Sequence, residues 1–184
     1  MSTTRLLVLG AVKIAQPVHG YDVRRELLTW GVADWANVQP GSIYHHLRTL
    51  ERDRMLSVAG VDKEGARPAR TSYQLTEDGD AMFEVLLREA FWKVTGRPAD
   101  LMAGLCFLPY LSRGEAIAAL ESRINQINDA LRSATFWSPE VFKPAHVSEA
   151  YRLSESRFRG EADWARELID RLRSGAYDMA PENT

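Results

Sequence analysis

Apolar residues recur with a helical period along most of the chain. In residues 4–15 they cover nearly every side of the predicted helix, which is typical of a buried helix. Residues 20–30 show a narrower apolar face, as expected of a short amphipathic helix. A third helix is predicted from Pro40 to about residue 52, because proline suits a first helical position. One face of this third helix carries Ile43, Leu47 and Leu50.

The period changes from 3.6 to 2 after the third helix. Residues 55–61 and 70–75 are predicted strands, and the turn-rich residues between them make a β-hairpin. Thr76 then provides an N-cap for a long helix over about residues 77–94. The first half of the chain is therefore predicted to contain three helices followed by a hairpin.

The rest of the chain is predicted to be helical. A short helix over residues 100–111 is followed by a capping box, Ser112 to Glu115, which begins a helix reaching about residue 134. Its apolar residues alternate spacings of three and four, which favours pairing with another helix. A last helix is predicted over residues 147–173. The predicted fold class is mostly α with a small β-hairpin.

Three helices followed by a hairpin are typical of a winged helix-turn-helix, in which the third helix enters the DNA major groove and the hairpin contacts phosphates. We therefore expect an N-terminal winged helix-turn-helix domain over residues 1–80. Residues 81–184 are expected to form a helical domain for dimerisation, with space for an effector.

Short motifs in the first domain make this interpretation more specific. They are His19-Gly20-Tyr21-Asp22, Gly41-Ser42-Ile43-Tyr44 with Leu47 and Leu50, and Tyr73-Gln74-Leu75-Thr76 with Gly79. Together they resemble the PadR family of bacterial transcriptional regulators, in its longer subgroup with a helical C-terminal dimerisation domain. The resemblance implies a homodimeric repressor that a small aromatic or cationic effector releases from its operator. One departure is Arg54, where the family usually has a glycine that ends the third helix.

Candidate DNA contacts lie on the outward face of the third helix and in the hairpin. That face has basic and hydrogen-bonding groups and no carboxylate, while residues 63–71 hold a local excess of positive charge. A solvated helix face and a solvated loop are the alternative interpretations. The candidates on the helix are Ser42, Tyr44, His45, Arg48, Thr49 and Arg52, and those in the hairpin are Lys63, Arg67 and Arg70.

Large apolar residues of the second half are candidates for dimerisation and effector binding, although aromatic residues at helical spacing also occur in plain cores. The dimerisation candidates are Leu87, Phe91, Ile117, Leu120, Ile124, Ile127, Leu131, Phe158, Trp164 and Leu168. The effector candidates are Trp92, Phe107 and Tyr110.

Composition excludes several classes. The single cysteine, Cys106, excludes an internal disulfide, and four scattered histidines give no zinc-ligand spacing, so we expect no metal site and no cofactor. Nucleophile and phosphate-loop motifs of enzymes are missing. Lys13 interrupts the first apolar run, and no other run reaches membrane length, so we expect no membrane partner and a cytoplasmic protein. The alternative function is a winged-helix module that binds proteins and not DNA.

Overall fold

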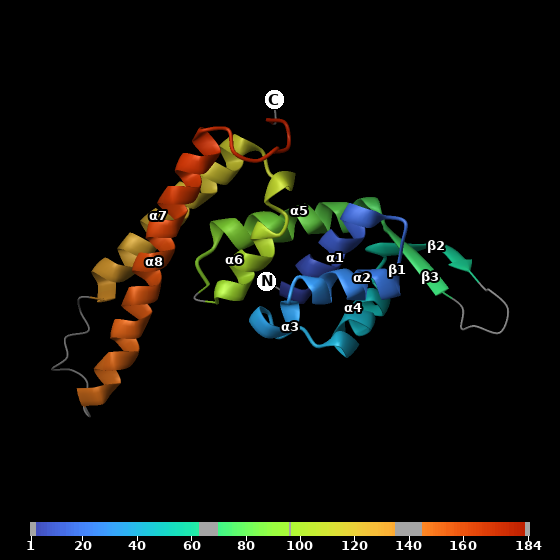
Figure 1. Ribbon diagram of the computed structural model, residues 1–184, viewed down its shortest axis with the longest axis horizontal. Coiled ribbons are helices and arrows are strands. Elements are labelled where there is room, and N and C mark those ends of the chain that lie inside the picture. The colour runs from blue at the N-terminus through green and yellow to red at the C-terminus, as the bar shows by residue number, and fades with distance from the viewer. Residues whose placement is uncertain (1–2, 63–69, 96, 135–144, 183–184) are drawn as a thin grey trace. The chain divides into compact units, whose positions relative to one another are not determined.

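The computed structural model describes residues 3–62, 70–95, 97–134 and 145–182. The chain forms two compact units. The first comprises residues 1–90 and 97–107, and the second comprises residues 91–96 and 108–184. Helices dominate both units, and the small sheet lies in the first (Figure 1). The predicted fold class is confirmed. The assignment of functions on either side of residue 80 stays a prediction.

The first unit contains the predicted helices and hairpin together with two elements that the pattern does not predict. The additional elements, β1 and α3, span only two and four residues, too few to show a period. The sheet has the order β1-β3-β2 with antiparallel pairs. In chain order the elements are α1 (Thr3–Ala15), β1 (Val18–His19), α2 (Gly20–Thr29), α3 (Val32–Trp35), α4 (Pro40–Arg52), β2 (Leu56–Asp62), β3 (Arg70–Leu75), α5 (Glu77–Trp92) and α6 (Pro98–Leu105).

Helix α1 forms the centre of the first unit. All seven residues from Leu6 to Val12 are buried, and α1 contacts α2, α4, α6 and β3. A Cβ atom at Gly10 would lie 2.2 Å from the ring of Phe107, so this glycine lets the aromatic ring pack directly on the helix backbone. The nearly all-round apolar pattern of residues 4–15 therefore matches a helix covered on every side.

Helix α4 ends in the left-handed conformation that the family's glycine would favour. Arg54 has a φ of 60°, its N–H donates to the Glu51 carbonyl (2.9 Å), and the Met55 N–H donates to the Leu50 carbonyl (2.8 Å). These two bonds define a Schellman motif with arginine at the position where glycine is common. The helix therefore ends in the same way with arginine as it would with glycine, although the Cβ atom of Arg54 adds a steric cost in the left-handed conformation.

Hydrogen bonds of Thr76 connect the start of α5 with the residues that precede β2. Thr76 accepts a hydrogen bond from the Gly79 N–H (3.0 Å) and donates one to the Arg54 carbonyl (2.7 Å). The predicted N-cap is confirmed. A Cβ atom at Gly79 would lie 1.9 Å from the Met55 carbonyl oxygen, so only glycine fits this close approach.

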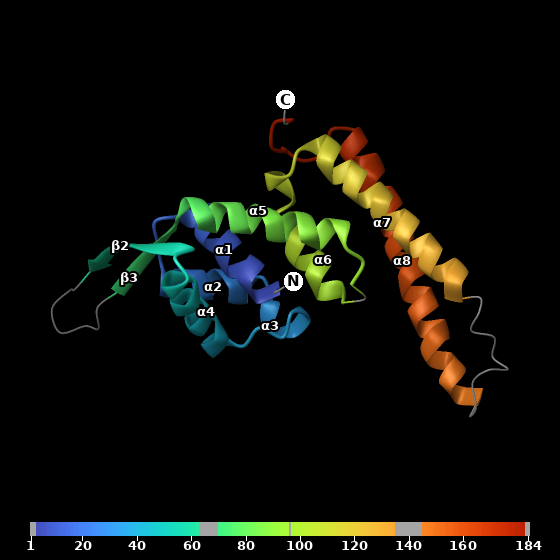
Figure 2. The same cartoon turned by 180° about the vertical axis from the view of Figure 1, so that it is seen from behind.

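The second unit is built on two antiparallel helices that lie side by side in both views (Figures 1 and 2). They are α7 (Arg113–Ala134) and α8 (Ser148–Arg173), and short 3-10 turns precede them at η1 (Leu108–Tyr110) and η2 (Ala145–Val147). The predicted capping box begins α7, with the Glu115 N–H donating to the Ser112 hydroxyl (3.2 Å). Leu120 and Ile127 of α7, like Ala165 of α8, are fully buried.

A buried arginine lies in the second unit. The guanidinium of Arg123 is 2% exposed and donates to the carbonyls of Phe91 (3.2 Å) and Lys93 (2.8 Å). It also pairs with Glu161 of α8 at 2.5 Å. Arg123 therefore joins the end of α5, α7 and α8 in one hydrogen-bonded group.

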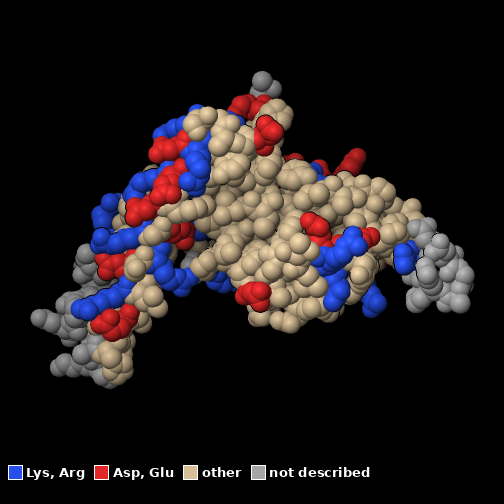
Figure 3. All heavy atoms as spheres, viewed as in Figure 1, with Lys and Arg blue, Asp and Glu red and all other residues tan. Residues whose placement is uncertain are grey.

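The outer surface of the two-helix unit carries both signs of charge. Figure 3 shows basic and acidic groups alternating along it. Ion pairs at helical spacing, such as Arg152 with Glu149 (3.0 Å) and Arg159 with Glu155 (2.6 Å), account for this pattern. Across the described ranges, no helix combines the length and apolar character needed to cross a membrane.

Candidate nucleic-acid interface

Helix α4 presents the two faces that its sequence predicts. Ile43, Leu47 and Leu50 are at most 1% exposed and hold the helix on the core. The opposite face places His45 and Arg48 in solvent, with Thr49 half-buried beside them. A surface of this kind, basic and able to hydrogen-bond, matches the edges of bases and the phosphates of DNA.

Two candidates on α4 already have local partners. The Ser42 hydroxyl donates to the Gln39 carbonyl (2.7 Å) in the first turn of the helix. Arg52, at the other end, donates to the Asp53 carboxylate through two nitrogens, each at 3.3 Å. Arg48 and His45 are therefore the better placed of the cationic or hydrogen-bonding candidates for reading a base.

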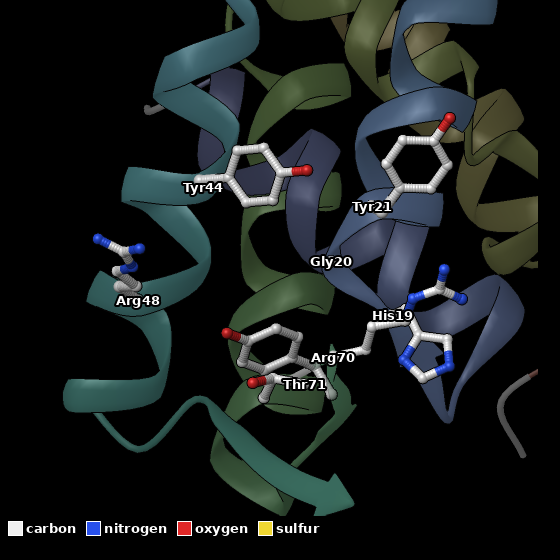
Figure 4. Close-up of a pocket in the computed structure, with 8 residues that line it drawn as sticks. His19, Gly20, Tyr21, Tyr44, Arg48, Arg70 and Thr71 are labelled. Carbon is white, nitrogen blue, oxygen red and sulfur yellow. The ribbon is translucent and has the colours of Figure 1, made fainter. Parts of the chain in front are cut away.

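A surface hollow lies beside α4. Its volume is about 260 Å³, and residues from the start of α2, from α4 and from β3 line it. The described lining contains two arginines, one histidine and several hydroxyl groups, but no carboxylate. Figure 4 shows the Arg48 and Arg70 guanidinium groups on opposite sides of this view. The lining residues are His19, Gly20, Tyr21, Tyr44, Arg48, Arg70, Thr71 and Tyr73.

The hollow depends on close packing at Gly20. A Cβ atom there would lie 3.2 Å from Leu47 and 3.4 Å from the ring of Tyr73, tighter than ordinary contact. Strand β1 adds to this arrangement, because Val18 pairs with Tyr73 and His19 with Ser72. The start of α2 is thus held against both α4 and β3.

Burial shifts the pKa values of two side chains on this side of the first unit. The pKa of Tyr73 is raised above its ordinary value, first by burial and then by Glu51, with Arg48 opposing the shift. The pKa of His46 is lowered by burial and by the positive charges of His45 and Arg5. Tyr73 is therefore a neutral phenol at pH 7, and His46 is mainly uncharged.

The described residues contain no group of three potential metal ligands among His, Cys, Asp and Glu.

The hairpin candidates divide into two groups. Arg70 is exposed at the beginning of β3 and lines the hollow. Lys63 and Arg67 lie outside the described residues.

The dimerisation candidates differ in exposure within the chain. Some are buried by the chain's own packing, namely Leu87, Phe91, Leu120, Ile127 and Leu168. Others are partly exposed and accessible to a partner, namely Ile117, Ile124, Leu131, Phe158 and Trp164.

The effector candidates belong to different units. Phe107 is fully buried in the first unit, with its ring 5.4 Å from that of Phe83 and 5.7 Å from that of Trp30. Trp92 and Tyr110 belong to the second unit and are 39% and 38% exposed.

Sequence reasoning did not assign a binding role to five residues of the hollow. His19, Gly20, Tyr21 and Tyr73 lie within the short motifs quoted above, whereas Thr71 does not. For the residues within motifs, that membership was the available signal. Their proximity follows only from the packing of α2 and β3 against α4.

The first unit, with its third long helix exposed on one face and its hairpin beside it, is a winged helix-turn-helix. Residues 8–85 match the model of the transcriptional regulator PadR-like family. The matched residues are thus similar to those of PadR-like transcriptional regulators. Comparison with curated proteins finds no match.

Solved structures of PadR proteins resemble the chain over most of its length. Bacillus subtilis PadR in complex with operator DNA shares 16% identity, covering 91% of this chain and 98% of that one, with a TM-score of 0.41. The PadR-like regulator BC1756 from Bacillus cereus shares 18% identity, with coverages of 91% and 94% and a TM-score of 0.39. Bacillus subtilis PadR in complex with p-coumaric acid shares 14% identity, with coverages of 93% and 99% and a TM-score of 0.37.

Proposed function

We propose that this regulator binds double-stranded operator DNA as a homodimer and represses transcription in the cytoplasm until a small aromatic or cationic molecule releases it. The observation that carries DNA binding is the outward face of α4, where exposed Arg48 and His45 lie opposite the fully buried core residues. The match of residues 8–85 to the PadR-like family supports a role in regulating transcription.

Selection of DNA by the purified protein tests this function directly. A random duplex pool is incubated with the full chain at low salt, where phosphate contacts are strongest, and bound sequences are amplified and read. Enrichment of a common sequence is expected. Failure to bind any duplex at low salt would contradict the proposal and favour the protein-interaction module.

Replacing Arg48 by alanine is expected to remove base discrimination at one position of each half-site. A guanidinium that forks onto a guanine edge contributes about 1–3 kcal/mol of preference over the wrong base. Affinities of the wild type and of Arg48→Ala are measured on the selected duplex and on all single-base variants. The matched control is Arg88→Ala, which removes a partly exposed arginine of α5 that pairs with Glu84. Equal sensitivity of Arg48→Ala and wild type to every base change would exclude Arg48 as a base reader.

Dimerisation is proposed to use the partly exposed apolar residues of α7 and α8. Ile124→Glu is expected to give monomers in sedimentation velocity, because a carboxylate buried without a partner in the interface costs several kcal/mol. Asn125→Glu, one position further along α7 and exposed, is the matched control and should leave the dimer intact. A stable Ile124→Glu dimer would place the interface elsewhere.

The effector is proposed to contact Trp92 and Tyr110, whose aromatic side chains are accessible to a planar ligand. Phe107, the third candidate, is not part of this proposal, because its ring is fully buried in the first unit against Gly10.

A further inference from the structure

We propose that residues 176–182, which follow α8, form a latch on the start of the second unit, and that the closed latch favours DNA binding. The proposal rests on the proposed function and describes how it is regulated. The existence of the latch is testable without DNA, so its failure is distinguishable from a failure of the proposed function.

The latch returns to the place where the chain enters the second unit. Figures 1 and 2 both show the chain after α8 turning back toward the start of α7. The Ala180 N–H donates to the carbonyls of Pro109 (2.9 Å) and Leu111 (3.1 Å), and Ala180 forms a parallel bridge with Ser112. Because the chain enters the second unit for the last time at Leu108, the latch holds the first residues after that passage.

The carboxylate of Glu182 closes the latch on α7. It accepts hydrogen bonds from the Gly114 N–H (2.9 Å) and from the Ser112 hydroxyl. The pKa of Glu182 is lowered first by the bond from Gly114, then by the hydroxyl, with a smaller contribution from Arg113. A negative charge at a helix N-terminus is favourable. Gly114 permits the contact, because a Cβ atom there would lie 2.9 Å from Oε2 of Glu182.

Arg113, the first residue of α7, holds the beginning of the latch. Its guanidinium donates to the carbonyls of Leu172, Ala176 (3.1 Å) and Tyr177 (2.9 Å). Tyr177 has a φ of 68°, which costs free energy in a residue with a side chain. The Glu182 end is exposed. Few exposed bonds working against backbone strain are expected of a segment that opens at low cost.

Restraint at this place favours DNA binding for a physical reason. A dimer that reads two half-sites must keep its reading helices at a fixed spacing, and a loose connection has to be ordered when DNA binds. The latch also holds Pro109 and Leu111, the neighbours of the proposed effector contact Tyr110. A molecule that moves Tyr110 therefore competes with closure, which couples effector binding to release of DNA.

Hydrogen exchange of the Ala180 amide measures the latch without DNA. Gly114→Ala and Glu182→Gln should each speed this exchange by about two- to fivefold, the contribution of a charge at a helix N-terminus. Gly114→Ala displaces the carboxylate while favouring α7 by helix propensity, so faster exchange would not reflect a weaker helix. The controls should exchange like wild type. They are Gly160→Ala, whose Cβ atom meets nothing within 4 Å, and Glu167→Gln, from an ion pair within α8.

Affinity for the selected duplex tests the coupling. Gly114→Ala and Glu182→Gln are expected to bind about two- to fivefold more weakly per protomer, and both controls like wild type. The loss should shrink on duplexes with one base pair inserted between the half-sites, because a loose connection tolerates altered spacing. By linkage, the unmodified duplex should slow exchange of the Ala180 amide in wild type. Urea unfolding verifies that each variant is folded.

The outcomes separate the latch from its role. Faster exchange together with weaker and more spacing-tolerant binding supports the proposal. Unchanged exchange in Gly114→Ala and Glu182→Gln overturns the latch itself. Faster exchange with wild-type affinity overturns its role in DNA binding. If wild type selects no duplex, the proposed function fails and the coupling fails with it, while the exchange rates still show whether the latch exists.

Discussion

Replacing Gly79 by alanine is expected to lower the free energy of unfolding by about 3 kcal/mol or more. The new Cβ atom would lie 1.9 Å from the carbonyl oxygen of Met55 and 2.9 Å from its carbonyl carbon. Both are backbone atoms, so no side-chain rotation relieves the overlap. The first turn of α5 would have to move away from the hairpin, which would break the hydrogen bonds from Thr76 to the carbonyls of Arg54 and Met55.

The matched control is Gly41→Ala in α4. Nothing lies within 4 Å of a Cβ atom at Gly41, so this variant should be as stable as wild type or more stable by up to about 1 kcal/mol. Urea unfolding followed by circular dichroism, with a separate probe for each unit, measures both changes. A Gly79→Ala protein with wild-type stability would show that the start of α5 is not fixed to the hairpin.

Replacing Arg123 by alanine is expected to cost about 3–5 kcal/mol in the second unit. Three groups lose their partner at once, namely the carboxylate of Glu161 and the carbonyls of Phe91 and Lys93. The carboxylate is only 21% exposed, so water replaces the guanidinium incompletely. The expected result is early unfolding of α7 and α8, measured by hydrogen exchange of their amides.

Arg123→Lys provides the matched control for charge. An ammonium group can pair with Glu161 but cannot reproduce the planar fork that also serves the two carbonyls. Its stability should therefore fall between those of wild type and Arg123→Ala. Equal stability of all three proteins would mean that the buried charge contributes nothing beyond what apolar packing supplies.

The sequence predicts those parts of the fold that have a period or a local signal. Helix α4 follows from the spacing of Ile43, Leu47 and Leu50, and the hairpin follows from the change to a period of two. The pairing of Val18 with Tyr73 in β1 has no local signal, because strand β3 determines it from 55 residues away. Arg123 was missed for a similar reason, since its carbonyl partners lie about 30 residues earlier in the chain.

In the candidate site, too, the sequence predicts only what lies within one element. The outward face of α4 belongs to one helix, so a helical projection is enough to identify Arg48 and His45. The hollow combines residues 19–21 with Tyr44 and Arg48 of α4 and with three residues of β3, and only the packing of α2 and β3 against α4 brings them together. Sequence patterns within one element cannot reveal a site of that kind.

The two units alternate along the chain, and this limits where a chimera can be joined. Residues 91–96 belong to the second unit, yet the chain then returns to the first unit through α6 before α7 begins. A chimera joined after Trp92 would lose Phe107 and leave the Gly10 side of α1 uncovered. A chimera joined after Phe107 would instead place foreign backbone opposite Arg123. Exchange of the second unit between chains of this fold therefore requires compensating changes at Gly10 or at Arg123, rather than a single crossover.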